Sequence, residues 1–301
     1  MISAKLEGHT DGVTSVASLP DARAVSGSKD GTLRIWRERQ GEPGWDSVVL
    51  GQLSAATTTV RVIDAHQLAC GAADGSLCVW SEQSAGHWIK ETLVGHSKGI
   101  TVIERFPNGK LLTASRDGTL RIGPPGHDGS IVLTHRGEGI HSVKVLSDGA
   151  FVSVGSESVC MWRLNPEMET WTQAYLGEPR GAKVLPNGDV IGFTDPVGVA
   201  IWKCDAEGVW QRALFREDWR DMENLTPLDN GRIVLGTSWM DEGSLRTDLE
   251  VIRYKDGELR DEATFTDKYG DADRAYFVLP DGHFAIAFPT GLMHLYRGTP
   301  R

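Results

Sequence analysis

Residues 8–36 read GHTDGVTSVASLPDARAVSGSKDGTLRIW, and residues 95–123 read GHSKGITVIERFPNGKLLTASRDGTLRIG. Both stretches begin with Gly-His and contain Asp-Gly followed by Thr-Leu-Arg-Ile. They end at one position, which is Trp36 in the first stretch and Gly123 in the second. The shared pattern indicates an internal repeat, and the period of a repeat is informative about architecture.

The position of Trp36 recurs along the whole chain. The equivalent residues are Trp36, Trp80, Gly123, Trp162, Trp202, Tyr254 and Tyr296, at successive intervals of 44, 43, 39, 40, 52 and 42 residues. A period of about 40–45 residues made of short strands and tight turns is typical of a β-propeller blade with four antiparallel strands. Because one blade cannot bury both faces of its sheet, blades must stack on one another. The repeat predicts seven blades in a single domain spanning residues 1–301.

Turn residues divide each repeat into strands. Asp30-Gly31, Asp74-Gly75 and Asp117-Gly118 are typical of two-residue hairpin turns, because Asp and Gly accept positive φ. A second series of turn pairs comprises Asn108-Gly109, Asp148-Gly149, Asn187-Gly188, Asn230-Gly231 and Asp281-Gly282. The fourth strand of a repeat is expected to begin at a second tryptophan, which is Trp45, Trp88, Trp171 or Trp210. The apolar residues alternate with polar ones over runs of strand length, and the 35 glycines disfavour helices. We therefore expect an all-β chain.

The two ends of the chain are predicted to share one sheet. The last repeat stops soon after its third strand, LMHLYRG at residues 292–298. The segment ISAKLEG at residues 2–8 precedes the first Gly-His and reads as the missing outer strand. Such pairing would close the last blade and remove an open sheet edge.

These stretches resemble WD40 repeats in their Gly-His pair, Asp-Gly turn and terminal Trp. The Asp that follows the Trp in that family is replaced here by Arg37, Ser81, Arg163 and Lys203. The resemblance extends over essentially the whole chain and is strongest in the first three repeats. It implies a seven-bladed WD40-like propeller. It also implies the usual role of WD40 proteins, which is to assemble protein complexes.

The resemblance further implies a hydrogen-bonded network inside the blades. The positions concerned are His9, Ser26, Asp30 and Trp36 in blade 1, Asp74 and Trp80 in blade 2, and His96, Thr113 and Asp117 in blade 3. Blade 4 keeps Ser153, Glu157 and Trp162 at matching places. A Ser, a His and an Asp also suggest a nucleophilic triad. Since the set recurs from blade to blade and a catalytic triad has no reason to repeat, we interpret it as structural.

The charge and the cysteine content of the chain limit its expected binding partners and its expected cellular compartment. The net charge of −10, from 31 basic and 41 acidic residues, disfavours non-specific binding to nucleic acid or to an anionic membrane. The segment MISAKLEGHT lacks the apolar core of a signal peptide, and no apolar run reaches membrane-spanning length. Four cysteines lie inside strand patterns: Cys70, Cys78, Cys160 and Cys204. They predict buried free thiols and a cytoplasmic protein, which we expect to be monomeric on its own.

No motif in the sequence predicts catalysis, a cofactor or a metal. The chain lacks a G-x-S-x-G elbow, a phosphate loop and a Cys-x-x-Cys pair. His127, His135 and His141 lie near Asp128, but without the short spacing of zinc motifs. The prediction is a non-catalytic scaffold or adaptor for protein or short-peptide partners. An enzyme or small-ligand binder that uses the central channel is the alternative, because fold does not determine function.

One group of candidate partner-binding residues lies on the loop face that carries the Asp-Gly turns. The charges there are mixed, since aligning the repeats places on this face Arg116, His141, Arg180 and Arg274, together with Lys29, Thr14, Thr58, Thr101, Asp195 and Glu223. An ordinary solvated face is one interpretation. The other is a site for a partner segment with acidic groups, which Arg can bind through two parallel hydrogen bonds.

A second group surrounds an insertion in the sixth repeat. The segment SWMDEGSLRTD at residues 238–248 accounts for the interval of 52, and FREDWRDMEN at residues 215–224 leads into the same repeat. Both are expected to be loops that bring Trp219, Met222, Trp239 and Met240 together. Trp and Met are enriched in protein interfaces, but the two tryptophans could equally pack on each other to close a long loop.

Overall fold

The computed structural model describes the following residues: 2–39, 44–84, 86–124, 131–137, 139–156, 158–165, 167–177, 180–185, 187–194, 198–204, 210–216, 222–227, 232–241, 244–255, 258–267, 275–278, 284–287 and 293–296. They belong to two compact units. The first unit comprises residues 1–134 with 273–299, and the second comprises residues 135–272 with 300–301.

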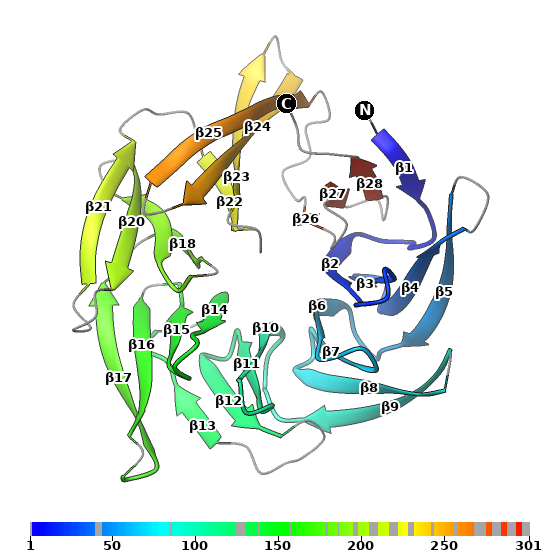
Figure 1. The fold of residues 1–301 in the computed structure, drawn as a ribbon, viewed down its shortest axis with the longest axis horizontal. Coiled ribbons are helices and arrows are strands. Elements are labelled where there is room, and N and C mark those ends of the chain that lie inside the picture. The colour runs from blue at the N-terminus through cyan, green and yellow to red at the C-terminus, as the bar shows by residue number, and fades with distance from the viewer. Residues whose placement is uncertain are drawn as a thin grey trace. The chain divides into compact units, whose positions relative to one another are not determined.

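Four four-stranded antiparallel sheets make up the first unit (Figure 1). Sheet 1 consists of β2 (Val13–Ser18), β3 (Ala24–Ser28), β4 (Thr32–Glu38) and β5 (Trp45–Gln52). Sheet 2 consists of β6 (Thr57–Val62), β7 (Gln67–Ala72), β8 (Ser76–Ser84) and β9 (His87–Val94). Sheet 3 consists of β10 (Ile100–Arg105), β11 (Leu111–Ser115), β12 (Thr119–Gly123) and β13 (Ile131–Thr134). In each of these three sheets, consecutive strands are neighbours, as the repeat predicts.

Three further sheets of the same kind make up the second unit. Sheet 4 consists of β14 (Ser142–Val145), β15 (Phe151–Val154), β16 (Val159–Asn165) and β17 (Thr170–Gly177). Sheet 5 consists of β18 (Arg180–Val184), β19 (Val190–Thr194), β20 (Gly198–Cys204) and β21 (Trp210–Arg216). Sheet 6 consists of β22 (Met222–Pro227), β23 (Arg232–Asp241), β24 (Ser244–Lys255) and β25 (Glu258–Asp267). No helix among the described residues is long and apolar enough to cross a membrane.

Sheet 7, in the first unit, joins the two ends of the chain. Its strands are β26 (Ala275–Val278), β27 (Phe284–Ala287), β28 (Met293–Tyr296) and β1 (Ile2–Leu6). β1 pairs antiparallel with β28, in a register that runs from Ile2 opposite Tyr296 to Leu6 opposite Met293. The N-terminal strand therefore takes the outer position that the sequence left vacant in the last repeat.

The Asp-Gly turns differ in length from the expectation. β3 ends at Ser28 and β4 begins at Thr32, so the connection has three residues and not two. A two-residue hairpin turn needs positive φ at both central residues if it is of type I′, or at the first if it is of type II′. Here only Gly31 has a positive φ, +78°, while Asp30 uses its carboxylate to accept the Thr32 amide at 2.7 Å. Glycine is required at these turns: a Cβ on Gly75, whose φ is +88°, would lie 2.2 Å from the His96 carbonyl oxygen.

Apolar residues from facing sheets form the cores within each unit. Val25 and Leu33 of sheet 1 pack with Val60, Leu68 and other residues of sheet 2. Such burial, at about 25 cal/mol per Å² of apolar surface, is the main source of stability in stacked sheets. In the second unit, an equivalent cluster forms between sheets 4 and 5.

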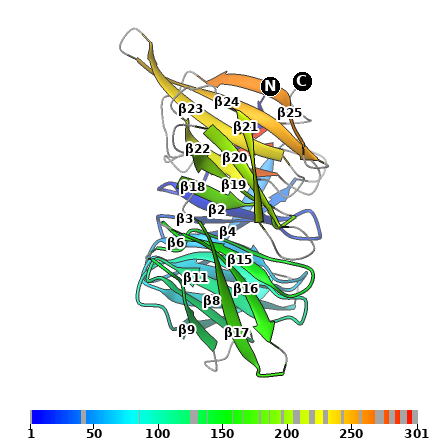
Figure 2. The same ribbon diagram turned by 90° about the vertical axis from the view of Figure 1, so that its left-hand side faces the viewer.

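The insertion in the sixth repeat forms strands where the sequence predicted a loop. β23 and β24 pair continuously from Arg232 opposite Arg253 to Asp241 opposite Ser244. Their partner β22 pairs only as far as Thr237, so the hairpin extends beyond it (Figure 2). The inserted residues therefore lengthen the β23–β24 hairpin. Within the hairpin, hydrogen bonds between the two strands satisfy the backbone amides and carbonyls of these residues.

Candidate functional site

A buried polar network lies in sheet 1. His9 Nε2 lies 2.7 Å from Ser26 Oγ, and Trp36 Nε1 donates to the same oxygen at 2.7 Å. His9 Nδ1 lies 3.1 Å from Asp30 Oδ2. The structure thus brings together all four residues that the sequence singled out in blade 1.

The donors and acceptors of this network follow from its geometry. A carboxylate only accepts hydrogen bonds, so His9 carries its proton on Nδ1, facing Asp30. Nε2 then accepts the Ser26 hydroxyl proton, while Ser26 Oγ accepts the Trp36 N–H. Burial lowers the pKa of His9 despite the opposing effect of Asp30, which keeps the ring neutral. Burial disfavours the Asp30 carboxylate, but hydrogen bonds from Thr32 and Thr10 outweigh this and lower its pKa to about 2.

Sheet 3 repeats the network without the indole. His96 Nε2 lies 2.9 Å from Thr113 Oγ1, and His96 Nδ1 lies 3.2 Å from Asp117 Oδ2. The pKa of Asp117 is again lowered to about 2 by hydrogen bonds from Thr119 and the Ser97 amide, which outweigh its burial. Gly123 occupies the aromatic position, so Thr113 has no Trp N–H to accept.

Sheet 2 keeps the turn but not the network. Asp74 accepts the Ser76 amide at 3.0 Å and the Ser54 hydroxyl at 2.7 Å. Leu53 occupies the place of His9, 21 residues before the turn Asp, and is buried. Trp80 is buried, and its indole N–H makes no hydrogen bond of normal geometry within the described part of the chain. The structure therefore does not join Asp74 to Trp80.

Sheet 4 contains a network residue that the sequence analysis missed. Trp162 Nε1 donates to Ser153 Oγ at 2.7 Å, as in sheet 1. The histidine beside them is His135, whose Nε2 lies 3.4 Å from the Ser153 carbonyl oxygen. Its signal in the sequence was its distance of 27 residues from Trp162, the same as from His9 to Trp36. Glu157, at the matching turn position, lies outside the described residues.

The burial of these groups excludes a catalytic role for the Ser-His-Asp set. The Ser26 side chain is 0% exposed, and its oxygen already has two partners. A nucleophile must reach its substrate, and Ser26 cannot. The network instead fixes the histidine and the Asp-Gly turn in place.

The same turns carry exposed basic side chains on one end of sheets 1 to 3, here called the turn face. Lys29 precedes Asp30 and Arg116 precedes Asp117, and both side chains are exposed. Their backbones are held by hydrogen bonds from Lys29 N to Gly12 O at 2.8 Å and from Arg116 N to Gly99 O at 3.1 Å. The turn face therefore presents cations on rigid supports.

Threonines predicted at this face connect neighbouring sheets. Thr14 donates to the Thr57 carbonyl of sheet 2 at 2.7 Å, and Thr58 donates to the Ile100 carbonyl of sheet 3. Both lie where the register of the innermost strand shifts, which is typical of a β-bulge. Their hydroxyls are thus used inside the unit.

The other predicted partner-binding residues belong to the second unit or lie outside the described residues. His141 is partly buried, and burial together with nearby Lys183 lowers its pKa to about 4. Arg180 begins β18, while Trp239 and Met240 lie in β23, paired with Arg246 and Leu245. Trp219 and Arg274 lie outside the described residues, as do His127 and Asp128.

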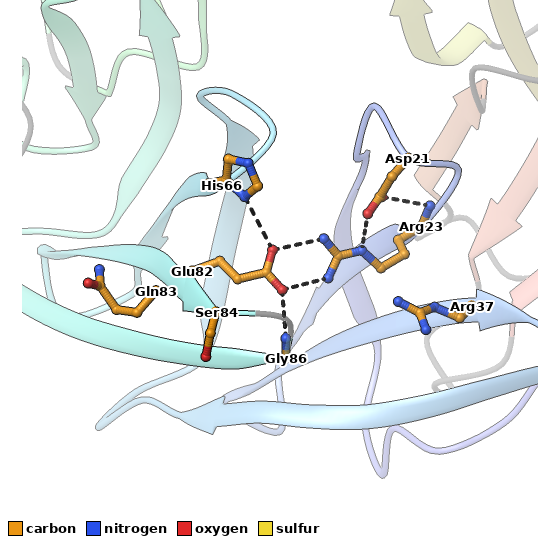
Figure 3. Close-up of a pocket in the computed structure, with 8 residues that line it drawn as sticks. All are labelled: Asp21, Arg23, Arg37, His66, Glu82, Gln83, Ser84 and Gly86. Atoms are coloured by element: carbon orange, nitrogen blue, oxygen red, sulfur yellow. Dashed lines mark hydrogen bonds and ion pairs between the residues drawn. The ribbon is translucent and has the colours of Figure 1, made fainter.

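A polar pocket lies between sheets 1 and 2, at the end opposite the turn face (Figure 3). Its volume is about 570 Å³. Asp21 and Arg23 line it from the β2–β3 connection, and His66 lines it from the β6–β7 connection. Arg37 of β4 and Glu82 of β8 complete its charged wall.

A buried ion pair spans this pocket. Arg23 Nη1 and Nη2 donate to Glu82 Oε1 and Oε2 at 3.3 and 3.0 Å, and Arg23 Nε donates to Asp21 at 2.6 Å. The Arg23 guanidinium also lies 5.8 Å from the centre of the Trp88 ring. The hydrogen bonds from Arg23 are the largest cause of the lowered pKa of Glu82. Sequence reasoning missed the pair because Arg23 and Glu82 are 59 residues apart and belong to different repeats.

Comparisons with known proteins agree with this fold. The family model "WD domain, G-beta repeat" matches residues 2–37 and 88–122. The chain is similar to the crystal structure of the WD40 β-propeller domain of Doa1, with a TM-score of 0.71 and 18% identity over 99% of this chain and 96% of that one. It is also similar to a chain in the crystal structure of the mitotic checkpoint complex, with a TM-score of 0.72 and 13% identity over 99% of this chain and 94% of that one. The chain therefore contains WD40 repeats at the matched residues, and its fold is that of the WD40 β-propellers.

Proposed function

We propose that this protein is a non-catalytic scaffold or adaptor that binds protein or short-peptide partners through its turn face. WD40 propellers commonly serve as protein-interaction scaffolds, and one similar structure is a multi-protein complex. The observation that carries the proposal is the pair Lys29 and Arg116, exposed on turns that buried networks hold rigid. Rigid supports favour binding because less conformational freedom is lost when the partner docks.

The charge of these turns indicates the chemistry of the partner. The chain as a whole is acidic, with a net charge of −10, yet the described turn face carries Lys29 next to Asp30 and Arg116 next to Asp117. Arg and Lys bind carboxylates through charge-assisted hydrogen bonds. We propose a partner segment with acidic groups, bound in the cytoplasm by a monomeric protein. The buried free thiols of Cys70, Cys78 and Cys160 support a reducing compartment.

Charge reversal tests the turn face. The variant Lys29→Glu/Arg116→Glu should lose partners that the wild-type protein recovers from its native source, measured by quantitative mass spectrometry. The matched control is Arg39→Glu/Lys110→Glu, which changes the charge equally at exposed residues on the opposite end of the sheets. Equal recovery by the two variants would contradict the proposal.

The extended β23–β24 hairpin offers a second, separable test. Binding energy at interfaces concentrates in a few large side chains, and Trp is prominent among them. If Trp219 and Trp239 contact a partner, changing both to Ala should abolish its recovery and leave the melting temperature unchanged. Retained partners with a lowered melting temperature would show that the tryptophans pack within the protein.

A further inference from the structure

The pocket between sheets 1 and 2 contains a charged group, the Arg37 guanidinium, that has no partner among the residues the structure describes. Glu82 is fully engaged, because it accepts both Arg23 nitrogens, accepts the Gly86 amide at 2.8 Å and lies 3.6 Å from His66 Nδ1. Asp21 is bonded to Arg23 at 2.6 Å. Both carboxylates therefore belong to a cluster organised by Arg23.

Arg37 stands apart from that cluster. Its side chain is exposed, and it makes no hydrogen bond or ion pair with any residue in the described part of the chain. Its guanidinium is directed toward the Arg23–Glu82 pair and not away from the pocket (Figure 3). Arg37 also differs from the WD40 repeat, in which an Asp follows the Trp.

The uncharged lining supplies additional donors. Gln83, Ser84 and Gly86 come from the end of β8 and the connection to β9. The side chains of Gln83 and Ser84 are exposed and make no hydrogen bond among the described residues. Their amide and hydroxyl groups can donate to the acceptor atoms of a ligand.

We propose that this pocket binds a carboxylate carried on a peptide, with Arg37 holding the carboxylate through two parallel hydrogen bonds. A guanidinium matches the planar geometry of a carboxylate. Gln83 and Ser84 then donate to the peptide carbonyls next to it. The volume of about 570 Å³ has room for these groups in addition to the carboxylate itself.

The surrounding charges determine which anions are accepted. Asp21, Glu82 and Arg23 together carry one net negative charge, at the edge of the space into which Arg37 points. A carboxylate brings a single negative charge, whereas a phosphate brings nearly two at neutral pH. Like charges repel more strongly in a partly desolvated pocket than in water. The pocket therefore selects a carboxylate over a phosphate.

Nuclear magnetic resonance of the full chain tests this site with defined probes. The Gly86 amide lies in the pocket and reports on it through its chemical shift. The probes are N-acetyl-aspartate N-methylamide for a side-chain carboxylate, N-acetyl-alanine for a chain terminus, acetate and inorganic phosphate. One or both peptide probes should give saturable shifts at lower concentration than acetate, and phosphate should bind more weakly than either. The probe that binds more tightly identifies the source of the carboxylate.

Matched variants assign the binding to Arg37. Arg37→Gln should weaken the peptide probe about tenfold, the loss expected for one partly exposed charge-assisted pair. Arg39→Gln is the control, since Arg39 is also exposed but is paired with Asp46 at 2.7 Å and does not line the pocket. Absence of saturable shifts in the wild-type protein, equal affinity in Arg37→Gln, or tighter binding of phosphate would each overturn the proposal. Because Lys29 and Arg116 lie at the other end of the sheets, their charge reversal should leave probe binding unchanged, and either proposal can therefore fail alone.

Discussion

Ser26 is the residue on which two buried polar groups depend. Its oxygen serves both Trp36 Nε1 and His9 Nε2, each at 2.7 Å. Ser26→Ala would leave both without a partner, and a buried unsatisfied group costs about 1–3 kcal/mol. Thr113 serves only His96 Nε2. In urea unfolding, Ser26→Ala should therefore destabilise the protein by about 3 kcal/mol and Thr113→Val by about half as much. Equal losses would contradict this account of the network.

Ala22 has an unfavourable backbone conformation. Its φ is +65°, at a turn position where the repeats of sheets 3 and 4 have Gly109 and Gly149, with φ of +86° and +83°. A left-handed conformation costs an L-residue about 1–2 kcal/mol, of which glycine's greater freedom in the unfolded chain offsets part. Ala22→Gly should raise the free energy of unfolding by about 0.5–1 kcal/mol. The reverse change, Gly149→Ala, isolates the backbone effect because a Cβ there meets no atom within 4 Å. Gly149→Ala should lower the free energy of unfolding. If both variants were more stable than the wild type, or both less stable, the explanation would be refuted.

The sequence predicts network residues well where the motif is intact and poorly where it has decayed. His9, Ser26, Asp30 and Trp36 could be named from residues 8–36, because each chemical group has a fixed place in the motif. His135 could not, since Thr134 replaces the preceding glycine of the motif. The spacing from Ser153 to Trp162 is also one residue shorter than from Ser26 to Trp36, which hides the alignment.

At the scale of elements, β1 is the strand whose loss has the clearest consequence. It is the partner of β28, the strand that would otherwise end sheet 7. Deleting residues 1–7 removes this pairing and exposes an unpaired strand edge, which favours aggregation. The truncated protein should melt many degrees lower than the full chain in differential scanning calorimetry, or be insoluble. Melting within a degree or two of the full chain would show that β1 contributes little.

Hydroxyl links between sheets give a second prediction at this scale. Thr14 Oγ1 donates to the Gly27 carbonyl of its own sheet at 3.1 Å and to the Thr57 carbonyl of the next at 2.7 Å. Thr14→Val keeps the shape of the side chain but deletes the donor, and should cost about 1–2 kcal/mol in denaturant unfolding. Thr14→Ser retains the hydroxyl and should be closer to the wild type. If Thr14→Ser were as unstable as Thr14→Val, the lost methyl group and not the hydrogen bond would be responsible.

Features made from separate repeats were beyond the reach of the sequence. The strands and their order follow from turn residues a few positions apart, so the seven sheets could be anticipated. The ion pair of Arg23 with Glu82 depends on how two repeats pack, which no local pattern reports. The sequence predicts a loop where β23 and β24 extend, because SWMDEGSLRTD is an insertion relative to the other repeats. Backbone pairing between the two strands instead makes the inserted residues part of the hairpin.

Across the whole molecule, the networks predict a loss of stability in acid. The pKa values of His9, His96 and His135 are lower in the folded protein than the ordinary value of 6.5, because burial disfavours the charged ring. The unfolded chain therefore binds more protons as the pH falls below 6.5, and stability declines. Asp30 and Asp117, with pKa values of about 2 against an ordinary 3.8, add a second decline below pH 4 or so.

This prediction is checked by urea unfolding at a series of pH values. The wild-type protein should lose stability in two stages, first below the ordinary pKa of histidine and then below that of aspartate. His9→Gln/His96→Gln removes two titrating rings and should be less stable at neutral pH, with a shallower first stage. An unchanged slope in that variant would show that other groups control the response to acid.

The threonine links between sheets also bear on how such a chain can change over evolutionary time. Each link needs a specified donor on one sheet, but its acceptor is a backbone carbonyl, as at Thr57 and Ile100. Every amino acid supplies that carbonyl, so the side chains of the receiving strand can vary without loss of the contact. Neighbouring repeats need not co-vary to remain attached. A repeat can therefore differ from its neighbours and still be attached to them, as the second repeat, with Leu53 in the place of His9, is linked to the first and the third.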